Sequence, residues 1–180
     1  MPKVYILYKK SISLYRFLQK RDMQVTKFHL FIASGFGSGF SPVAPGTAGA
    51  LLACVMWGVA SLFLPYEAVM WATGVCVLLF TALGIVSAGK AEQVWGKDPS
   101  KVVIDEMVGV WIPLLAAPEG EARGWYALGA FVLFRFFDIV KPLGVRRMER
   151  LEGGLGIMMD DILAGIYSLI ILIGIRCFAG

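Results

Sequence analysis

The chain has 180 residues, enough for one domain, and 58% of them are hydrophobic against 17% charged, which is more apolar than soluble domains usually are. This composition and a mean hydropathy of +0.72 indicate a membrane protein. The net charge of +4 does not indicate nucleic-acid binding, because the basic residues lie beside apolar segments, as expected for contact with anionic lipid headgroups.

Residues 1–30 form a basic segment that precedes the apolar part of the chain. The segment mixes seven lysines and arginines with apolar and aromatic residues, and it holds no apolar run long enough for a secretory signal. Two interpretations are equally compatible with it: an amphipathic segment on the cytoplasmic leaflet, or a frayed terminus. We expect the rest of the chain, 31–180, to form a single helical domain.

Glycines recur in residues 35–42 and 45–49, at the start of an apolar helix. Glycine lets backbone amides approach a ligand closely, and a helix N-terminus offers free N–H groups and a positive dipole end to phosphate. The pattern lacks the lysine of a Walker loop and the third glycine of a dinucleotide fingerprint. It therefore predicts either an anion-binding loop or a turn at the membrane interface that is capped by Thr47.

Apolar segments follow in order, at 48–64, 68–88, 102–117, 125–137 and 162–178. The first two approach the roughly 20 residues of a membrane-spanning helix and are expected to form a hairpin at Pro65. The two middle segments are short, so tilted or re-entrant helices are as compatible with them as full crossings. The predicted fold class is all-α, a compact membrane domain of about four to five apolar helices with two of them short.

Lysine and arginine positions predict the orientation in the membrane. Basic residues precede the first apolar helix, lie between the second and third, and follow the fourth, whereas the opposite loops offer only Arg123. The positive-inside rule therefore places the N-terminus in the cytoplasm. On that topology the glycine-rich loop and every charged group considered below fall at helix ends on the cytoplasmic face.

Two pairs of adjacent carboxylates interrupt the apolar sequence, and Asp138 lies between them in the chain. Ionisable groups beside lipid are costly and usually functional. Gathered at one site, these acids would repel each other without a cation, and magnesium takes oxygen ligands. We predict a site for one or two Mg²⁺ ions, with five carboxylates as its ligands: Asp105, Glu106, Asp138, Asp160 and Asp161. One of the last two is also expected to cap the helix that follows.

Basic residues flank Asp138. Arg135 lies three positions before it, on the same helix face, so an ion pair is expected, and an arginine held in this way is set to bind phosphate in bidentate fashion. Lys141 follows, at a position where Pro142 disfavours helix. The predicted phosphate-binding residues are Ser38, Thr47, Arg135 and Lys141.

These motifs, in this order, resemble the phosphatidylglycerophosphatase A family. The resemblance extends from about residue 27 to residue 168 and rests on four stretches, 37–49, 104–109, 134–142 and 153–165. It implies an all-helical, magnesium-dependent phosphatase of bacterial membranes that hydrolyses phosphatidylglycerophosphate to phosphatidylglycerol and phosphate. Combined with the charge distribution, it predicts a multi-pass protein of the bacterial inner membrane with its active site on the cytoplasmic face.

The residue inventory excludes several other phosphatase chemistries. The single histidine, His29, lies in the basic segment, no cysteine has an arginine six residues later, and no Asp-x-Asp occurs. Metal-assisted hydrolysis remains, with a metal that polarises the phosphate and activates water; a phospho-aspartate intermediate stays open. The predicted catalytic residues are Asp105, Arg135, Lys141 and Asp161.

Two other classes of protein share some of these features. Carboxylates within apolar sequence, with glycine and proline breaks, also occur in ion-coupled transporters, whose sites lie near the bilayer midplane. A structural membrane subunit would use the same polar residues only to join helices. Because the acids here fall at helix ends on one face and no internal repeat is present, the phosphatase interpretation is preferred.

Overall fold

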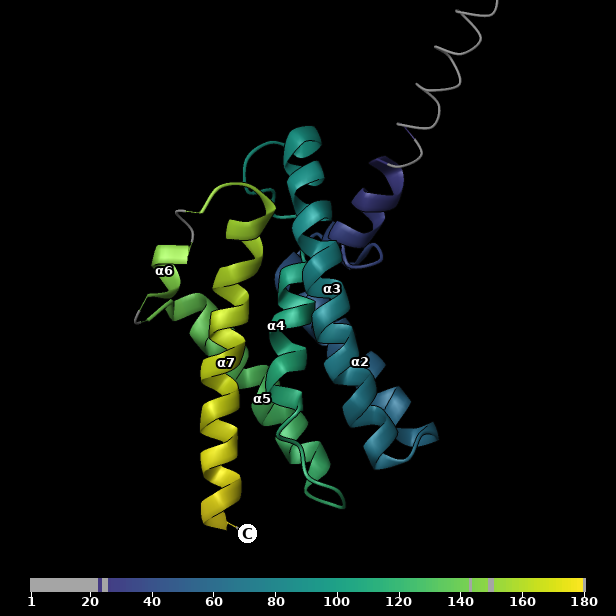
Figure 1. Ribbon diagram of the computed structural model, residues 1–180, viewed down its shortest axis with the longest axis vertical. Coiled ribbons are helices and arrows are strands. Elements are labelled where there is room, and N and C mark those ends of the chain that lie inside the picture. The colour runs from purple at the N-terminus through teal and green to yellow at the C-terminus, as the bar shows by residue number, and fades with distance from the viewer. Residues whose placement is uncertain (1–22, 24–25, 143, 149–150, 180) are drawn as a thin grey trace, which may run out of the picture.

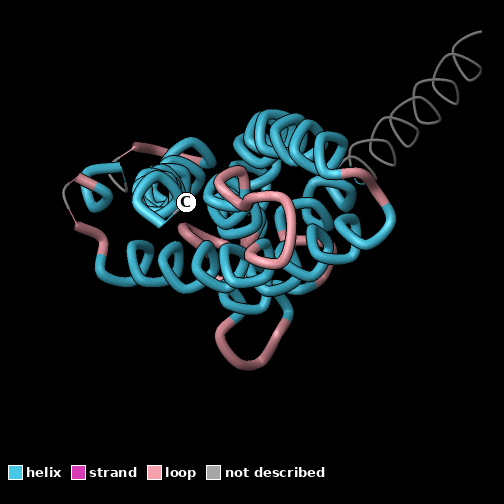
Figure 2. Tube along the Cα trace, turned by 90° about the horizontal axis from the view of Figure 1, so that it is seen from below, coloured by secondary structure: helices cyan, strands magenta, loops and turns pink. Residues whose placement is uncertain are grey.

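The computed structural model describes residues 23, 26–142, 144–148 and 151–179. Within these ranges the chain is helix or loop and contains no strand (Figure 2), which confirms the all-α prediction. The basic segment 1–30 lies almost entirely outside the described residues. Its last described part belongs to a helix, 26–33, that continues across the expected boundary at residue 30.

The helices follow one another with short connections (Figure 1). After residues 26–33 come the 3-10 turn η1 (Ser38–Phe40), α2 (Pro45–Phe63), α3 (Tyr66–Trp95), α4 (Ile104–Leu114), α5 (Arg123–Val140), α6 (Val145–Met148) and α7 (Gly154–Ala179). Among the described residues, α2, α3 and α7 are long and apolar enough to cross a membrane. The expected hairpin is therefore α2 and α3, joined through Leu64 and Pro65.

The short helix α4 forms the centre of the molecule. It contacts α2, α3, α5 and α7, and in Figure 1 it lies between α7 and α3. All residues from Met107 to Leu114 are buried, as expected for a helix that is hydrophobic on every side. With 11 residues, α4 is too short to span a bilayer and is enclosed by the longer helices.

Two glycines let α4 and α7 pack with their backbones in contact. A Cβ atom on Gly165 would overlap the carbonyl oxygen of Gly109, and one on Gly109 would overlap the ring of Phe134. Small residues allow this close approach between apolar helices. Gly109 lies one turn beyond Asp105, and Gly165 lies one turn beyond Asp161, so the contact brings the two acidic pairs together.

Three expectations about helix ends are wrong. Helix α7 begins at Gly154, so Asp160 and Asp161 are inside it and neither caps it. The low helix propensity of glycine favoured a later start of α7. Gly154 instead packs directly on α3, where an added Cβ atom would overlap the Ile85 carbonyl oxygen. Thr47 does not cap α2, because the N-cap residue is Ala44 and no side chain caps it.

The third difference is in α3, which continues through the polar residues 90–95 to Trp95. Thirty residues of helix span about 45 Å, against roughly 30 Å for the hydrocarbon layer. The polar end of α3 therefore extends beyond the apolar layer. Outside that layer its charged side chains are solvated, so the segment can remain helical.

Candidate active site

The predicted site residues converge on one cavity of about 290 Å³. The cavity lies where the first turns of α2 and α4 meet the end of α5 and the second turn of α7. Eight of the nine residues predicted as metal ligands or phosphate-binding groups line it: Thr47, Asp105, Glu106, Arg135, Asp138, Lys141, Asp160 and Asp161. Residues from four helices, far apart in sequence, are thus brought to one place.

Three carboxylates at the bottom of the cavity are arranged as metal ligands would be. One oxygen each from Asp105, Glu106 and Asp161 lies within 4.8 Å of the others. An oxygen of Asp105 and one of Glu106 are buried without a hydrogen-bond partner in the described structure. Because buried polar atoms are normally paired, these oxygens fit a hard cation, which takes carboxylate ligands. We call these three residues the acidic triad.

The protonation of the triad also depends on its surroundings. Burial raises the pKa of Asp105 well above its usual value, and the adjacent charge of Glu106 raises it further. Burial raises the pKa of Glu106 as well. It is therefore unfavourable for several of these carboxylates to be ionised at once, and a divalent cation would offset their mutual repulsion.

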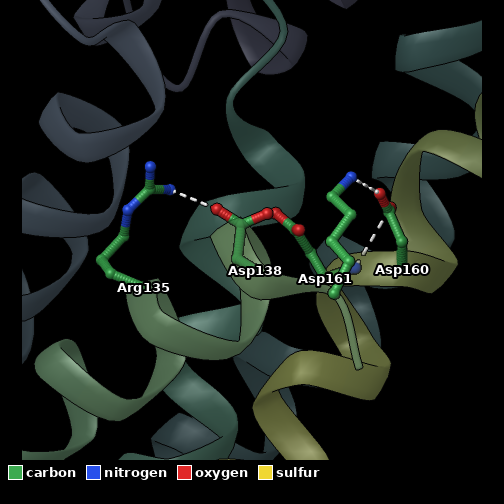
Figure 3. A network of polar contacts seen from close by, with 5 residues as sticks. Arg135, Asp138, Asp160 and Asp161 are labelled. Atoms are coloured by element: carbon green, nitrogen blue, oxygen red, sulfur yellow. Dashed lines mark hydrogen bonds and ion pairs between the residues drawn. The ribbon is translucent and has the colours of Figure 1, made fainter. Parts of the chain in front are cut away.

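Asp138 joins the triad to Arg135. Nη1 of Arg135 lies 2.7 Å from Oδ2 of Asp138, one turn later in α5, so the expected ion pair is confirmed. Figure 3 shows the carboxylates of Asp138 and Asp161 directed toward one another, and both residues line the cavity. Asp138 lies outside the triad but in contact with it, between the acids and the guanidinium.

Lys141 connects the end of α5 to α7. Its Nζ lies 2.8 Å from Oδ2 of Asp160, and the other oxygen of Asp160 accepts the N–H of Asp161 at 3.1 Å (Figure 3). Helix α5 stops before Pro142, as expected of the residue that precedes a proline, and Lys141 ends it in the left-handed conformation, with φ of 47°. Asp160 thus pairs with a lysine, whereas Asp161 faces the other carboxylates.

The first turn of α2 closes the cavity on another side. A Cβ atom on Gly46 would overlap Oε1 of Glu106 and would lie 3.4 Å from Nη1 of Arg135. Glycine is therefore required here for close approach, and Thr47 lines the cavity next to it. This is the part of the glycine-rich region that reaches the site.

Ser38 is not among the residues that line the cavity. Its hydroxyl donates to the carbonyl of Gly35 at 2.8 Å, inside its own turn. The nearby Gly39 packs on the backbone of Lys101, whose carbonyl oxygen a Cβ would overlap. The loop around η1 thus supports the segment that leads into α4, and a phosphate-binding role for Ser38 stays a prediction.

The loop between α3 and α4 also reaches the cavity. Asp98, Pro99 and Ser100 line it, although none of the three was among the predicted site residues. Their signal was positional, because the positive-inside rule places this loop on the same membrane face as the acids.

The fold and the site together define a class of protein, an all-helical membrane protein with a buried carboxylate cluster beside paired arginine and lysine. Comparison with known proteins makes this class specific, since a family model described as phosphatidylglycerophosphatase A matches residues 31–176. The chain belongs to this family. It is therefore a phosphatase that acts on phosphomonoesters, and the family implies a phospholipid substrate and association with a bacterial membrane.

Three curated relatives are similar over most of their length. A Bacteroides thetaiotaomicron protein named "Putative phosphatidylinositol-3-phosphatase" is 58% identical over 84% of this chain and 95% of its own. Phosphatidylglycerophosphatase A of Escherichia coli is 40% identical over 78% of each chain. The Haemophilus influenzae protein of the same name is 39% identical over 87% of this chain and 93% of its own. No solved structure matches the chain.

Proposed function

We propose that the chain hydrolyses phosphatidylglycerophosphate to phosphatidylglycerol and inorganic phosphate, with Mg²⁺, at the cytoplasmic face of the bacterial inner membrane. The observation that carries the proposal is the acidic triad, with two buried carboxylate oxygens that lack partners, beside Arg135 and Lys141 in one cavity. Family membership supports the choice of substrate.

Asp105, Glu106 and Asp161 would hold the metal, with Asp138 and Asp160 adjoining them. Bound there, Mg²⁺ supplies polarisation of the phosphate and activation of water for in-line attack. The acids do not bind a phosphate by themselves, because their charges repel it. They therefore define the metal side of the cavity, and the basic residues define the phosphate side.

Arg135 and Lys141 would bind the nonbridging oxygens of the phosphate. Both are already fixed by carboxylates, at 2.7 Å to Asp138 and 2.8 Å to Asp160, so little side-chain freedom is lost when phosphate binds. A guanidinium donates through several N–H groups at once, so Arg135 can keep Asp138 and still donate to phosphate. Charge that develops on the phosphate is stabilised by such preorganised donors.

A second lipid substrate is favoured by a specific observation. The relative with 58% identity bears the name of a phosphatidylinositol-3-phosphatase, and its substrate is also a phosphate monoester on a lipid headgroup. The same acids and bases would serve either reaction. We therefore propose phosphatidylinositol 3-phosphate as the alternative substrate.

The test is phosphate release by the purified chain in detergent micelles that contain either lipid. We expect release from phosphatidylglycerophosphate with Mg²⁺ and loss of release with excess chelator. Magnesium-dependent release only from the inositol lipid would support the second substrate. Folded protein that releases phosphate from neither lipid would contradict the proposal and favour a transporter or structural role.

Asp161→Asn tests the metal role directly. Removing one carboxylate of the acidic triad should lower kcat by about 100-fold or more, the magnitude seen when a preorganised charge-stabilising group is lost, and should abolish thermal stabilisation by Mg²⁺. Glu119→Gln, an exposed acid in the opposite loop, is the matched control and should retain activity. Asp161→Asn protein with near-normal turnover would exclude Asp161 as a ligand.

A further inference from the structure

A second cavity adjoins the active site and has no part in the chemistry described above. Its volume is about 530 Å³, within the range of roughly 300–1,000 Å³ that is typical of small-molecule sites. It shares Asp98, Ile157 and Asp160 with the active-site cavity. A molecule whose phosphate lies at the acidic triad therefore has room to extend past Asp160 into this second space.

The cavity is built between the polar end of α3 and the start of α7. Gly154 packs on the backbone of α3, where its Cβ would overlap the Ile85 carbonyl oxygen and lie within 2.6 Å of the Gly89 nitrogen. Glu92 lies further along α3, within two turns of Ile85. One of its oxygens accepts the N–H of Asp98 at 3.3 Å, and the other lies 3.9 Å from a Cβ placed on Gly153. The hydrogen bond thus ties Glu92 to the α3–α4 loop, and Gly153, just before α7, lies next to it.

The lining of this cavity differs in charge from the active site. It contains the side chains of Glu92, Lys97, Asp98 and Glu152, besides Asp160 at the shared wall. Carboxylates accept hydrogen bonds and ammonium groups donate them, so this lining suits a ligand part that presents hydroxyl groups. A second phosphate monoester would meet mainly negative charge here and be repelled.

We propose that this cavity, lined by Glu92, Lys97, Asp98 and Glu152, binds the polyol-derived part of the substrate headgroup that lies between the lipid diester and the terminal phosphate. This part is a glycerol with a single free hydroxyl or an inositol with several. The inference rests on the proposed function, because it assumes a lipid phosphomonoester at the acidic triad. Glu92 accepts from a headgroup hydroxyl, and Lys97 donates to a hydroxyl oxygen. Both residues then determine specificity and leave the hydrolytic chemistry to the active-site cavity.

The proposal separates two kinds of lipid phosphate. In phosphatidic acid the phosphate is attached directly to diacylglycerol, so no polyol is present to fill the second cavity. Glycerol and inositol headgroups both carry hydroxyls and share the chemistry that this lining recognises. A site that hydrogen-bonds substrate hydroxyls rejects analogues that lack them, because its polar groups are then left unpaired.

The experiment measures kcat/KM of the full-length protein with Mg²⁺ on three micellar lipids, phosphatidylglycerophosphate, phosphatidylinositol 3-phosphate and phosphatidic acid. Glu92→Ala and Lys97→Ala are compared with Gln93→Ala, an exposed neighbour on α3 that does not line the cavity. We expect a loss of about tenfold or more on at least one polyol lipid, as for a hydrogen bond to a charged group, with phosphatidic acid unchanged within about twofold.

Each outcome of this experiment either supports or contradicts the proposed headgroup site. Selective loss on the glycerol lipid, the inositol lipid or both supports the polyol cavity and identifies its ligand. Equal losses on all three lipids, or no loss with either variant, would overturn it. Glu92→Ala also removes the hydrogen bond to Asp98 and could lower activity only by disturbing the loop. Lys97→Ala is included as a second variant for this reason. Unmodified protein that hydrolyses none of the lipids would instead refute the proposed function, which is a distinguishable result.

Discussion

The side chain of Glu106 packs against the backbone of α2. The first turn of α2 approaches it so closely that Gly46 has no room for a side chain, and the same absent side chain would lie 3.4 Å from Arg135. Burial raises the pKa of Glu106, so both its position and its charge depend on neighbours that lie far away in sequence. A change at Gly46 should therefore act on the site through Glu106.

Gly46→Ala should lower activity by displacing Glu106 from the acidic triad. We expect kcat/KM to fall by about 10- to 100-fold, the range seen when residues that orient metal ligands are changed, with an equal or larger rise in the Mg²⁺ concentration needed for half-maximal rate. Gly58→Ala on the same helix is the control, because no atom lies near the added carbon, and it should be neutral. Equal effects of the two changes would contradict this account.

The raised pKa of Asp105 predicts how stability depends on pH when metal is removed. Its pKa is higher in the folded protein than in the unfolded chain, so the folded state binds the proton more tightly. The stabilisation of the folded state by this proton is complete below about pH 4. It is lost as the pH rises through the raised pKa of Asp105. With chelator present, the thermal midpoint should therefore fall over that range, and Mg²⁺ should restore it.

Asp105→Asn is the variant that checks the assignment. An amide does not titrate, so the midpoint of this variant in chelator should depend less on pH than that of the unchanged protein. The measurement is the midpoint in detergent at several pH values, with and without Mg²⁺. Identical pH slopes for the two proteins would show that Asp105 is not the titrating group.

At the scale of helices, the contact between α4 and α7 positions the metal ligands. Gly109 and Gly165 let the two backbones touch, and each lies one turn beyond an acidic pair. Because α4 is enclosed by four other helices, its first turn has little freedom to move. The acidic triad is thus preorganised by helix packing as well as by the acids' own contacts.

Gly165→Ala should separate α4 from α7. Its Cβ would overlap the Gly109 carbonyl oxygen, and overpacking of this kind costs about 1–3 kcal/mol. We expect a lower thermal midpoint in detergent and reduced activity. Gly174→Ala, further along α7 with open space around it, should leave both unchanged. An unaltered midpoint for Gly165→Ala would mean that the contact does not limit stability.

At the scale of the whole molecule, the site lies at one end of the bundle. The start of α2, the start of α4, the end of α5 and the first turns of α7 all meet there, and the α2–α3 and α4–α5 connections lie at the other ends of those helices. We expect a site at the helix ends to reach phosphate at headgroup level while acyl chains remain in the bilayer. Ion-coupled transporters are instead expected to have their sites near the bilayer midplane.

Labelling of single cysteines tests the proposed cytoplasmic orientation. In a background with Cys54, Cys76 and Cys177 replaced by serine, Gln93→Cys marks the site end and Glu119→Cys marks the other end. Both positions are exposed. A membrane-impermeant maleimide should label Gln93→Cys only in inside-out vesicles and Glu119→Cys only in right-side-out vesicles. The reverse pattern would invert the orientation and place the site outside the cytoplasm.

The sequence by itself determined the class of fold and predicted the residues that gather at the cavity. Apolar length sets the number of helices, because each must satisfy its own backbone groups in lipid. Charges that interrupt apolar sequence stand out for the same energetic reason. Asp105, Glu106, Arg135, Asp138, Lys141, Asp160 and Asp161 were therefore identified as site residues before their positions were known, and all seven line one cavity.

Only the tertiary structure decided which acids face each other and where the helices begin. Asp160 and Asp161 are adjacent in sequence, yet one pairs with Lys141 and the other joins Asp105 and Glu106, because successive helical residues point in different directions. Gly154 begins α7 through its contact with α3, against its own propensity. The cavity beside Glu92 also depends on that contact, since it is formed by surfaces that sequence spacing does not bring together.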